Sequence, residues 1–137
     1  MTSKKRATAA VAAACLGLLL SGCALGGTSY AALDRERQAG DELPEAVADG
    51  SDDIDADSAR HVGEHDGVEF WLARMDEPQS VCLVVYPSDE DWVVGCSSDG
   101  GQLGVSGRSG VYSLVPDGAP VPTGATKITE NLYQLGG

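Results

Sequence analysis

Two histidines four positions apart are the first residues of this sequence that could carry out chemistry. His61-Val62-Gly63-Glu64-His65 has the H-x-x-E-H spacing of a catalytic zinc site. That spacing works on a helix, where positions i and i+4 present both imidazoles to one metal ion. A glycine lies inside the motif and Asp66-Gly67 follows it at once, which favours an extended segment and a turn. We therefore expect two surface histidines here and no metal site.

A run of carboxylates just upstream is the second candidate. Its spacing matches positions 1, 3, 5 and 12 of an EF-hand calcium loop, with the oxygen ligands supplied by Asp53, Asp55, Asp57 and Glu64. Ser58 replaces the glycine of position 6 and Arg60 replaces the apolar residue of position 8, so the sharp turn and the core anchor are missing. An acidic, solvated linker is the simpler interpretation. Weak calcium binding is kept as the alternative function.

The remaining sequence offers no catalytic pattern. The glycine-rich stretch 100–110 has neither GxGxxG spacing nor a Walker lysine, and Ser106 does not complete a GxSxG motif. We therefore expect neither an enzyme activity nor a cofactor.

The N-terminus carries the three parts of an export signal. Lys4, Lys5 and Arg6 form a basic region, an apolar run spans 9–20, and small residues precede Cys23. The apolar run is shorter than the ~20 residues that a membrane-spanning helix needs. We expect residues 1–22 to be a signal peptide that is removed on export.

Leu20-Ser21-Gly22-Cys23 resembles the lipobox of bacterial lipoproteins. In that family the cysteine thiol receives a diacylglyceryl group, with acyl chains such as palmitate, and the chain is cut just before it. The resemblance implies that Cys23 is the lipid-bearing first residue of a protein held at the extracytoplasmic face of the cell membrane. Two acyl chains anchor a protein stably, whereas one anchors it marginally. An ordinary cleaved signal peptide with an incidental cysteine is the alternative.

The charge of the exported chain limits its partners. Removal of residues 1–22 takes three of the nine basic residues and none of the 21 acidic ones, which leaves a formal charge of −15. A surface of this sign disfavours binding to nucleic acid and to anionic lipid. The expected partners are the membrane, through the lipid on Cys23, and an envelope protein or ligand.

Composition divides the exported chain in two. Residues 24–57 contain one aromatic residue, Tyr30, and all the others of the exported chain lie in 58–135. Only the second part has enough large apolar side chains to offset the entropy of ordering. We predict an acidic, flexible tether over 23–57, with a short helix compatible with 30–38, and a folded domain over 58–137. The 34 residues 24–57 would have a root-mean-square reach of roughly 30 Å.

The second part is predicted to be mostly β, either all-β or α+β, with a small antiparallel sheet. Short apolar runs separated by turn residues place strands at 60–64, 68–73, 81–86, 92–96, 102–105, 111–115 and 127–135. In 68–73, Val68, Phe70 and Leu72 share one face, and Trp71 lies on the other. Trp71 is expected either to pack beneath a loop or second layer, or to be an exposed contact for a partner.

One hairpin can be predicted in register. If the five residues 87–91 join two strands symmetrically, one face carries the opposed pairs Tyr86–Trp92, Val84–Val94 and Cys82–Cys96. Opposed residues without mutual hydrogen bonds have Cα atoms ~4.5 Å apart, which is within disulfide range. Because exported proteins meet an oxidising environment, we expect a Cys82–Cys96 disulfide that staples the hairpin.

Short motifs along the exported chain carry a wider resemblance. They are Leu20-Ser21-Gly22-Cys23, Asp41-Glu42-Leu43-Pro44, Asp57-Ser58-Ala59-Arg60, Val81-Cys82-Leu83-Val84, Gly95-Cys96, Leu114-Val115-Pro116-Asp117-Gly118 and Glu130-Asn131-Leu132-Tyr133. With them the chain resembles a group of small uncharacterised lipoproteins of actinobacteria. The resemblance implies a location and an architecture and no particular activity. We therefore expect a non-catalytic, lipid-anchored interaction or ligand-binding module, which contacts its partner through a sheet edge or the Trp71 face.

Overall fold

The structure is a computed structural model that describes residues 28–136. The predicted signal peptide, 1–22, and the predicted lipidation site, Cys23, lie outside the described residues. No helix within 28–136 is long and apolar enough to cross a membrane.

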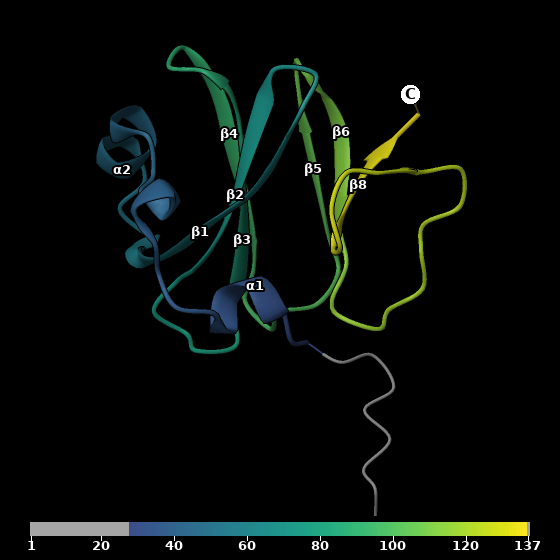
Figure 1. Cartoon of the computed structure of the whole chain (residues 1–137), viewed down its shortest axis with the longest axis horizontal. Coiled ribbons are helices and arrows are strands. Elements are labelled where there is room, and N and C mark those ends of the chain that lie inside the picture. The colour runs from purple at the N-terminus through teal and green to yellow at the C-terminus, as the bar shows by residue number, and fades with distance from the viewer. Residues whose placement is uncertain (1–27, 137) are drawn as a thin grey trace, which may run out of the picture.

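The described chain is mostly β, as the sequence predicts, and its strands form two antiparallel sheets rather than one (Figure 1). The first has the order β1-β2-β3-β4 and consists of β1 (Asp55–His65), β2 (Val68–Arg74), β3 (Val81–Ser88) and β4 (Asp91–Ser97). The second has the order β5-β6-β8-β7 and consists of β5 (Leu103–Gly107), β6 (Gly110–Leu114), β7 (Thr126–Lys127) and β8 (Leu132–Leu135).

The core between the two sheets follows from alternation along the strands. Val68, Phe70 and Leu72 of β2 all belong to it, which confirms that they share a face. The second sheet contributes Tyr112 of β6, whose ring meets that of Phe70 edge to face at a centroid distance of 5.0 Å. Such an edge-to-face aromatic pair adds stability beyond the area it buries.

The sandwich is closed on one side only. β4 and β5 pack along each other, and on the opposite side β1 is the edge of the first sheet and β7, next to β8, is the edge of the second. On that side β1 approaches the second sheet at two points. A Cβ on Gly63 would lie 2.8 Å from Thr129 Cγ2, and His65 Nε2 lies 3.2 Å from Gln134 Oε1. On the same side, residues 30–33 contact both sheets.

The predicted hairpin is formed by β3 and β4. Cys82 pairs with Cys96 and Val84 with Val94, and the two cysteines are joined by a disulfide with a Cα–Cα distance of 4.0 Å. The predicted Tyr86–Trp92 pair is wrong, because the register shifts between Val85 and Ser88 and Ser88 pairs with Asp91. The turn is therefore tighter than the predicted loop 87–91.

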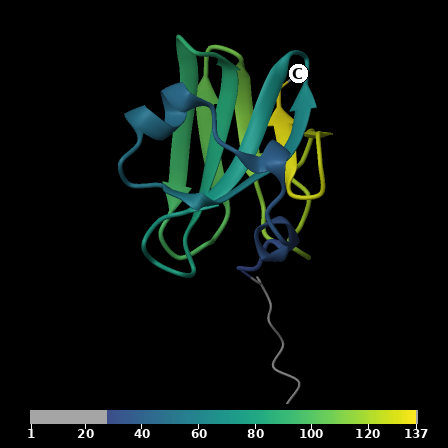
Figure 2. The ribbon, with the colours of Figure 1, turned by 60° about the vertical axis from the view of Figure 1, so that its left-hand side comes forward.

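The flexible tether predicted over 23–57 is a wrong assignment for the residues that the structure describes. The segment 28–54, here called the N-terminal segment, packs against both sheets and includes α1 (Ala31–Asp34), η1 (Ala39–Asp41) and α2 (Glu45–Gly50) (Figure 2). Tyr30 is fully buried in the core between the sheets, and its hydroxyl donates hydrogen bonds to the carbonyl oxygens of Gly100 (3.0 Å) and Gly101 (3.3 Å). Leu33 enters the same core.

The rest of the N-terminal segment covers the outer face of the first sheet. Leu43 and Val47 pack there with Trp71, Cys82 and Val84 in a second buried cluster. Trp71 is only 4% exposed, so it packs beneath a covering layer, and the Trp71 face as a partner contact is wrong. The middle strands are thus buried on both faces.

Substitution of Tyr30 tests whether the N-terminal segment is part of the folded domain. Tyr30→Ala should lower the free energy of unfolding by about 3–5 kcal/mol, because it leaves a cavity in the core. Tyr30→Phe keeps the ring and should cost only about 1–2 kcal/mol for the lost hydroxyl contacts. Urea unfolding measures both variants, and a Tyr30→Ala protein as stable as the wild type would restore the tether interpretation.

Candidate functional site

A cavity of about 380 Å³ lies at the open side of the sandwich. Its floor is formed by three leucines that belong to the core between the sheets: Leu72, Leu114 and Leu132. One wall is α1, through Ala31, Ala32 and Arg35 just after it, and the opposite wall is the turn before β8, through Thr129, Glu130 and Asn131. His61 and Val62 of β1 and Asp117 complete it. The surface offered to an occupant is mainly apolar with a polar rim.

Most polar groups of the rim are already engaged in structural contacts. Asp117 accepts a hydrogen bond from the Ala31 amide (2.9 Å) and another from the side-chain amide of Asn131 (2.8 Å). Asn131 also donates to the Val115 carbonyl oxygen (3.0 Å) and is only 6% exposed. These contacts tie α1, the loop after β6 and the turn before β8 together, and so they fix the shape of the cavity.

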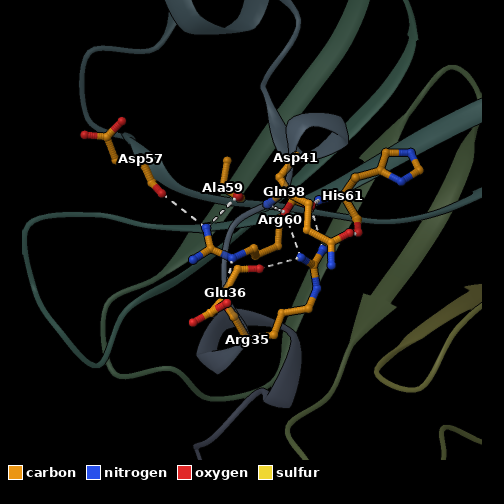
Figure 3. Close-up of polar contacts among 8 residues, drawn as sticks. All are labelled: Arg35, Glu36, Gln38, Asp41, Asp57, Ala59, Arg60 and His61. Carbon is orange, nitrogen blue, oxygen red and sulfur yellow. Dashed lines mark hydrogen bonds and ion pairs between the residues drawn. The ribbon is translucent and has the colours of Figure 1, made fainter.

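Arg35, the residue after α1, is held in place by a buried carboxylate (Figure 3). Its guanidinium forms a bidentate pair with Asp41, with N–O distances of 2.7 and 2.5 Å, and the Asp41 side chain is only 3% exposed. Asp41 also accepts hydrogen bonds from the backbone amides of Gln38 (2.7 Å) and His61 (2.9 Å). A paired and fully hydrogen-bonded buried carboxylate is the arrangement that burial of charge requires.

This arrangement occupies the free edge of β1. The His61 amide donates to Asp41 and the His61 carbonyl accepts from Arg35 (3.1 Å), while Arg60 Nε donates to the Arg35 carbonyl (3.0 Å). The Arg35 and Asp41 side chains thus form the hydrogen bonds to the backbone of β1 that a neighbouring strand would otherwise form. An edge blocked in this way is not a template for another chain, so a partner contact through this edge of the sheet is disfavoured.

The Arg35 guanidinium holds the pKa of the Asp41 carboxyl well below its usual range, and the backbone donors Gln38 and His61 lower that pKa further. Asp41 therefore stays ionised at any pH at which the protein would normally be found. Its charge belongs to the fold, and the group is unsuited to exchange protons with a substrate.

The residues that suggested metal chemistry are not brought together. His61 and His65 lie on the strand β1, and His61 Nε2 lies 3.4 Å from a Glu69 carboxylate oxygen. The EF-hand spacing kept as an alternative over 53–64 does not form a calcium loop, because Asp55 to Glu64 form an extended strand. Among residues 28–136 no group of three or more His, Cys, Asp or Glu side chains is arranged to hold a metal ion.

The other predicted residues have structural positions. Cys82 and Cys96 are bonded to each other beside the cluster that contains Trp71. Ser106 lies exposed on β5. The Trp71 indole is packed edge to face against the His61 ring at 4.8 Å, and its Nε1 has no hydrogen-bond partner.

Sequence reasoning missed the cavity and the Arg35–Asp41 pair. The cavity draws on five short stretches between residues 31 and 132, and no local pattern marks them as neighbours. Asp41, Asp117 and Asn131 do lie in motifs that carry the lipoprotein resemblance, but the resemblance assigns no function to the residues of those motifs.

Comparisons with known proteins identify no relative. No family model matches the sequence, and neither the curated proteins nor the solved structures yield a significant match.

The pH dependence of stability tests the role of Asp41. Asp41→Asn should lower the free energy of unfolding by about 2–3 kcal/mol at pH 7, because the Arg35 pair and its hydrogen bonds are weakened. A carboxyl with a lowered native pKa stabilises the fold fully above its unfolded pKa and loses that contribution as the pH falls below it. Urea unfolding at pH 7 and pH 3 should therefore show that the difference in unfolding free energy between the wild type and Asp41→Asn is smaller at pH 3.

Asp57→Asn is the matched control for this measurement. Asp57 also pairs with an arginine, Arg37 at 3.1 Å, but its side chain is 94% exposed. Its loss should change stability by less than about 1 kcal/mol. Two results would contradict the structural role of Asp41. One is an equal loss of unfolding free energy in Asp41→Asn and Asp57→Asn, and the other is a loss in Asp41→Asn that does not change with pH.

Proposed function

We propose that this chain is a lipid-anchored, non-catalytic binding protein of the extracytoplasmic face of the cell membrane, which takes a small, mainly apolar ligand into the cavity between the sheets. The observation that carries the binding role is the cavity itself. Its accessible apolar side chains, Ala31, Ala32 and Val62, would cover apolar surface of a ligand, and its polar rim would orient one polar group.

Two features support binding over catalysis. Arg35 is committed to Asp41, and both carboxylate oxygens of Asp117 are committed to Ala31 and Asn131. These groups hold the walls in place. A preformed pocket with few mobile polar groups suits recognition, because little ordering entropy is lost when the ligand enters.

The location rests on the sequence. The basic region, the apolar run and the lipobox-like Leu20-Ser21-Gly22-Cys23 favour export and acylation of Cys23. The excess of acidic residues in the exported chain gives anionic lipid headgroups nothing to attract, so a covalent lipid is the anchor that fits this composition.

Filling the cavity tests the binding role. Ala32 lines the cavity, so Ala32→Phe should occupy it, whereas Ala48→Phe places the same side chain on the exposed face of α2. Titration with 1-naphthol, followed by amide chemical shifts, should perturb Val62, Leu114 and Leu132 in the wild type and in Ala48→Phe. Ala32→Phe should weaken binding by about tenfold or more, which corresponds to about 1.4 kcal/mol.

Two outcomes of this titration would contradict the proposal. One is a set of shifts scattered over residues outside the cavity. The other is an Ala32→Phe protein that folds with wild-type stability and binds 1-naphthol as well as the wild type.

The anchor is tested separately by mass and by fractionation in a bacterial host. The protein should be recovered in the membrane fraction with a diacylglyceryl group on Cys23 as its first residue. Cys23→Ser should lose both properties, whereas the control Cys15→Ser, in the predicted signal peptide, should keep them. A wild-type protein without added lipid mass, or a Cys23→Ser protein that stays membrane-bound, would contradict the anchor.

A further inference from the structure

We infer that the anchored domain has a fixed polarity toward the membrane: the loops 75–80, 98–102 and 115–125 face the bilayer, and the turns 66–67, 89–90 and 108–109 face away from it. The first set is called the proximal end and the second the distal end. The inference rests on the proposed lipid anchor at Cys23 and adds which surface of the protein remains open to partners.

The start of the N-terminal segment is attached to the proximal end. The Asp117 amide donates to the Ser29 carbonyl (2.9 Å), and the Ala31 amide donates to the Asp117 carboxylate (2.9 Å). The buried Tyr30 between them donates to the carbonyl of Gly100 in the loop 98–102. Thr28 lies against the same loop, since a Cβ on Gly100 would lie 3.2 Å from its carbonyl oxygen.

Both ribbon views place the start of the described chain at the same end as these loops. It lies below α1, and the turns between β1 and β2, β3 and β4, and β5 and β6 lie at the opposite end (Figures 1 and 2). The strands that separate the two ends have seven or eight residues in β2 and β3. At ~3.3 Å per residue they hold the ends about 25 Å apart.

Covalent geometry keeps the proximal end near the lipid. Thr28 is the fifth residue after Cys23, and a chain of that length spans at most ~18 Å. The tether expected from composition alone would have a reach of roughly 30 Å and would allow any orientation. Burial of Tyr30 shortens the connection and thereby couples the orientation of the domain to the anchor.

Charge does not supply this orientation. The proximal loops contain Asp76, Glu77, Asp99 and Asp117, and the ranges 75–80, 98–102 and 115–125 contain no lysine or arginine. Anionic headgroups would repel such loops. The polarity therefore depends on the short covalent connection, and lengthening that connection should remove it.

Paramagnetic relaxation of backbone amides tests the polarity. The mature chain is coupled through the Cys23 thiol to a maleimide phospholipid in phosphatidylcholine nanodiscs that carry a gadolinium-chelating lipid. Amides 99–101 and 117–118 should relax at least about tenfold faster than amides 66–67 and 89–90, because the two ends are ~25 Å apart. The chemical coupling supplies the lipid whether or not a bacterial host acylates Cys23.

The control carries 20 Gly and Ser residues inserted between Cys23 and Thr28. Its connection has a root-mean-square reach of roughly 28 Å, so the domain should reorient freely and the two ends should relax at nearly equal rates. Equal relaxation of both ends in the unextended protein, or faster relaxation at the distal turns, would overturn the polarity. An unacylated Cys23 in the host contradicts the proposed anchor and leaves the result in nanodiscs unaffected.

Discussion

The rest of the structure depends on how the core is covered on the side of the sandwich next to β1 and β8, opposite the contact of β4 with β5. Two sheets that pack along β4 and β5 need their core covered on the opposite side, and no further strand among residues 28–136 covers it. The N-terminal segment fills this role: Tyr30 and Leu33 enter the core, and Arg35 with Asp41 satisfies the backbone of β1. Side chains from a largely non-β segment thus complete a β fold.

The cavity is the part of that side which the N-terminal segment leaves uncovered. α1 provides one wall and the turn before β8 the other, and Asp117 with Asn131 holds the two in position. The same contacts that stabilise the N-terminal segment therefore define the space available to a ligand. Under the proposed function, stability and ligand recognition share these residues, so evolution of one limits the other.

Local patterns predicted most of the strands well and the N-terminal segment badly. The last predicted strand, 127–135, is instead the two strands β7 and β8 joined by a turn. Alternation placed Val68, Phe70 and Leu72 in the core and gave the Cys82–Cys96 register, because both depend on the two-residue period of a strand. The tether was misassigned because average composition gave no weight to Tyr30, a single residue whose burial is decided by partners 70 positions away. The cavity was not predictable for the same reason, since its walls come from stretches far apart in the chain.

The contacts of Tyr30 and Ala31 also set the order in which an exported chain can fold. The start of the N-terminal segment is bound by residues 70 and 86 positions later. In a chain exported as proposed, its docking surface therefore does not exist until most of the chain has crossed the membrane. Long-range contacts of this kind are slow to form, and an incomplete sandwich exposes apolar surface while it waits. The end of the protein nearest the proposed anchor is therefore the first to emerge and among the last to be completed.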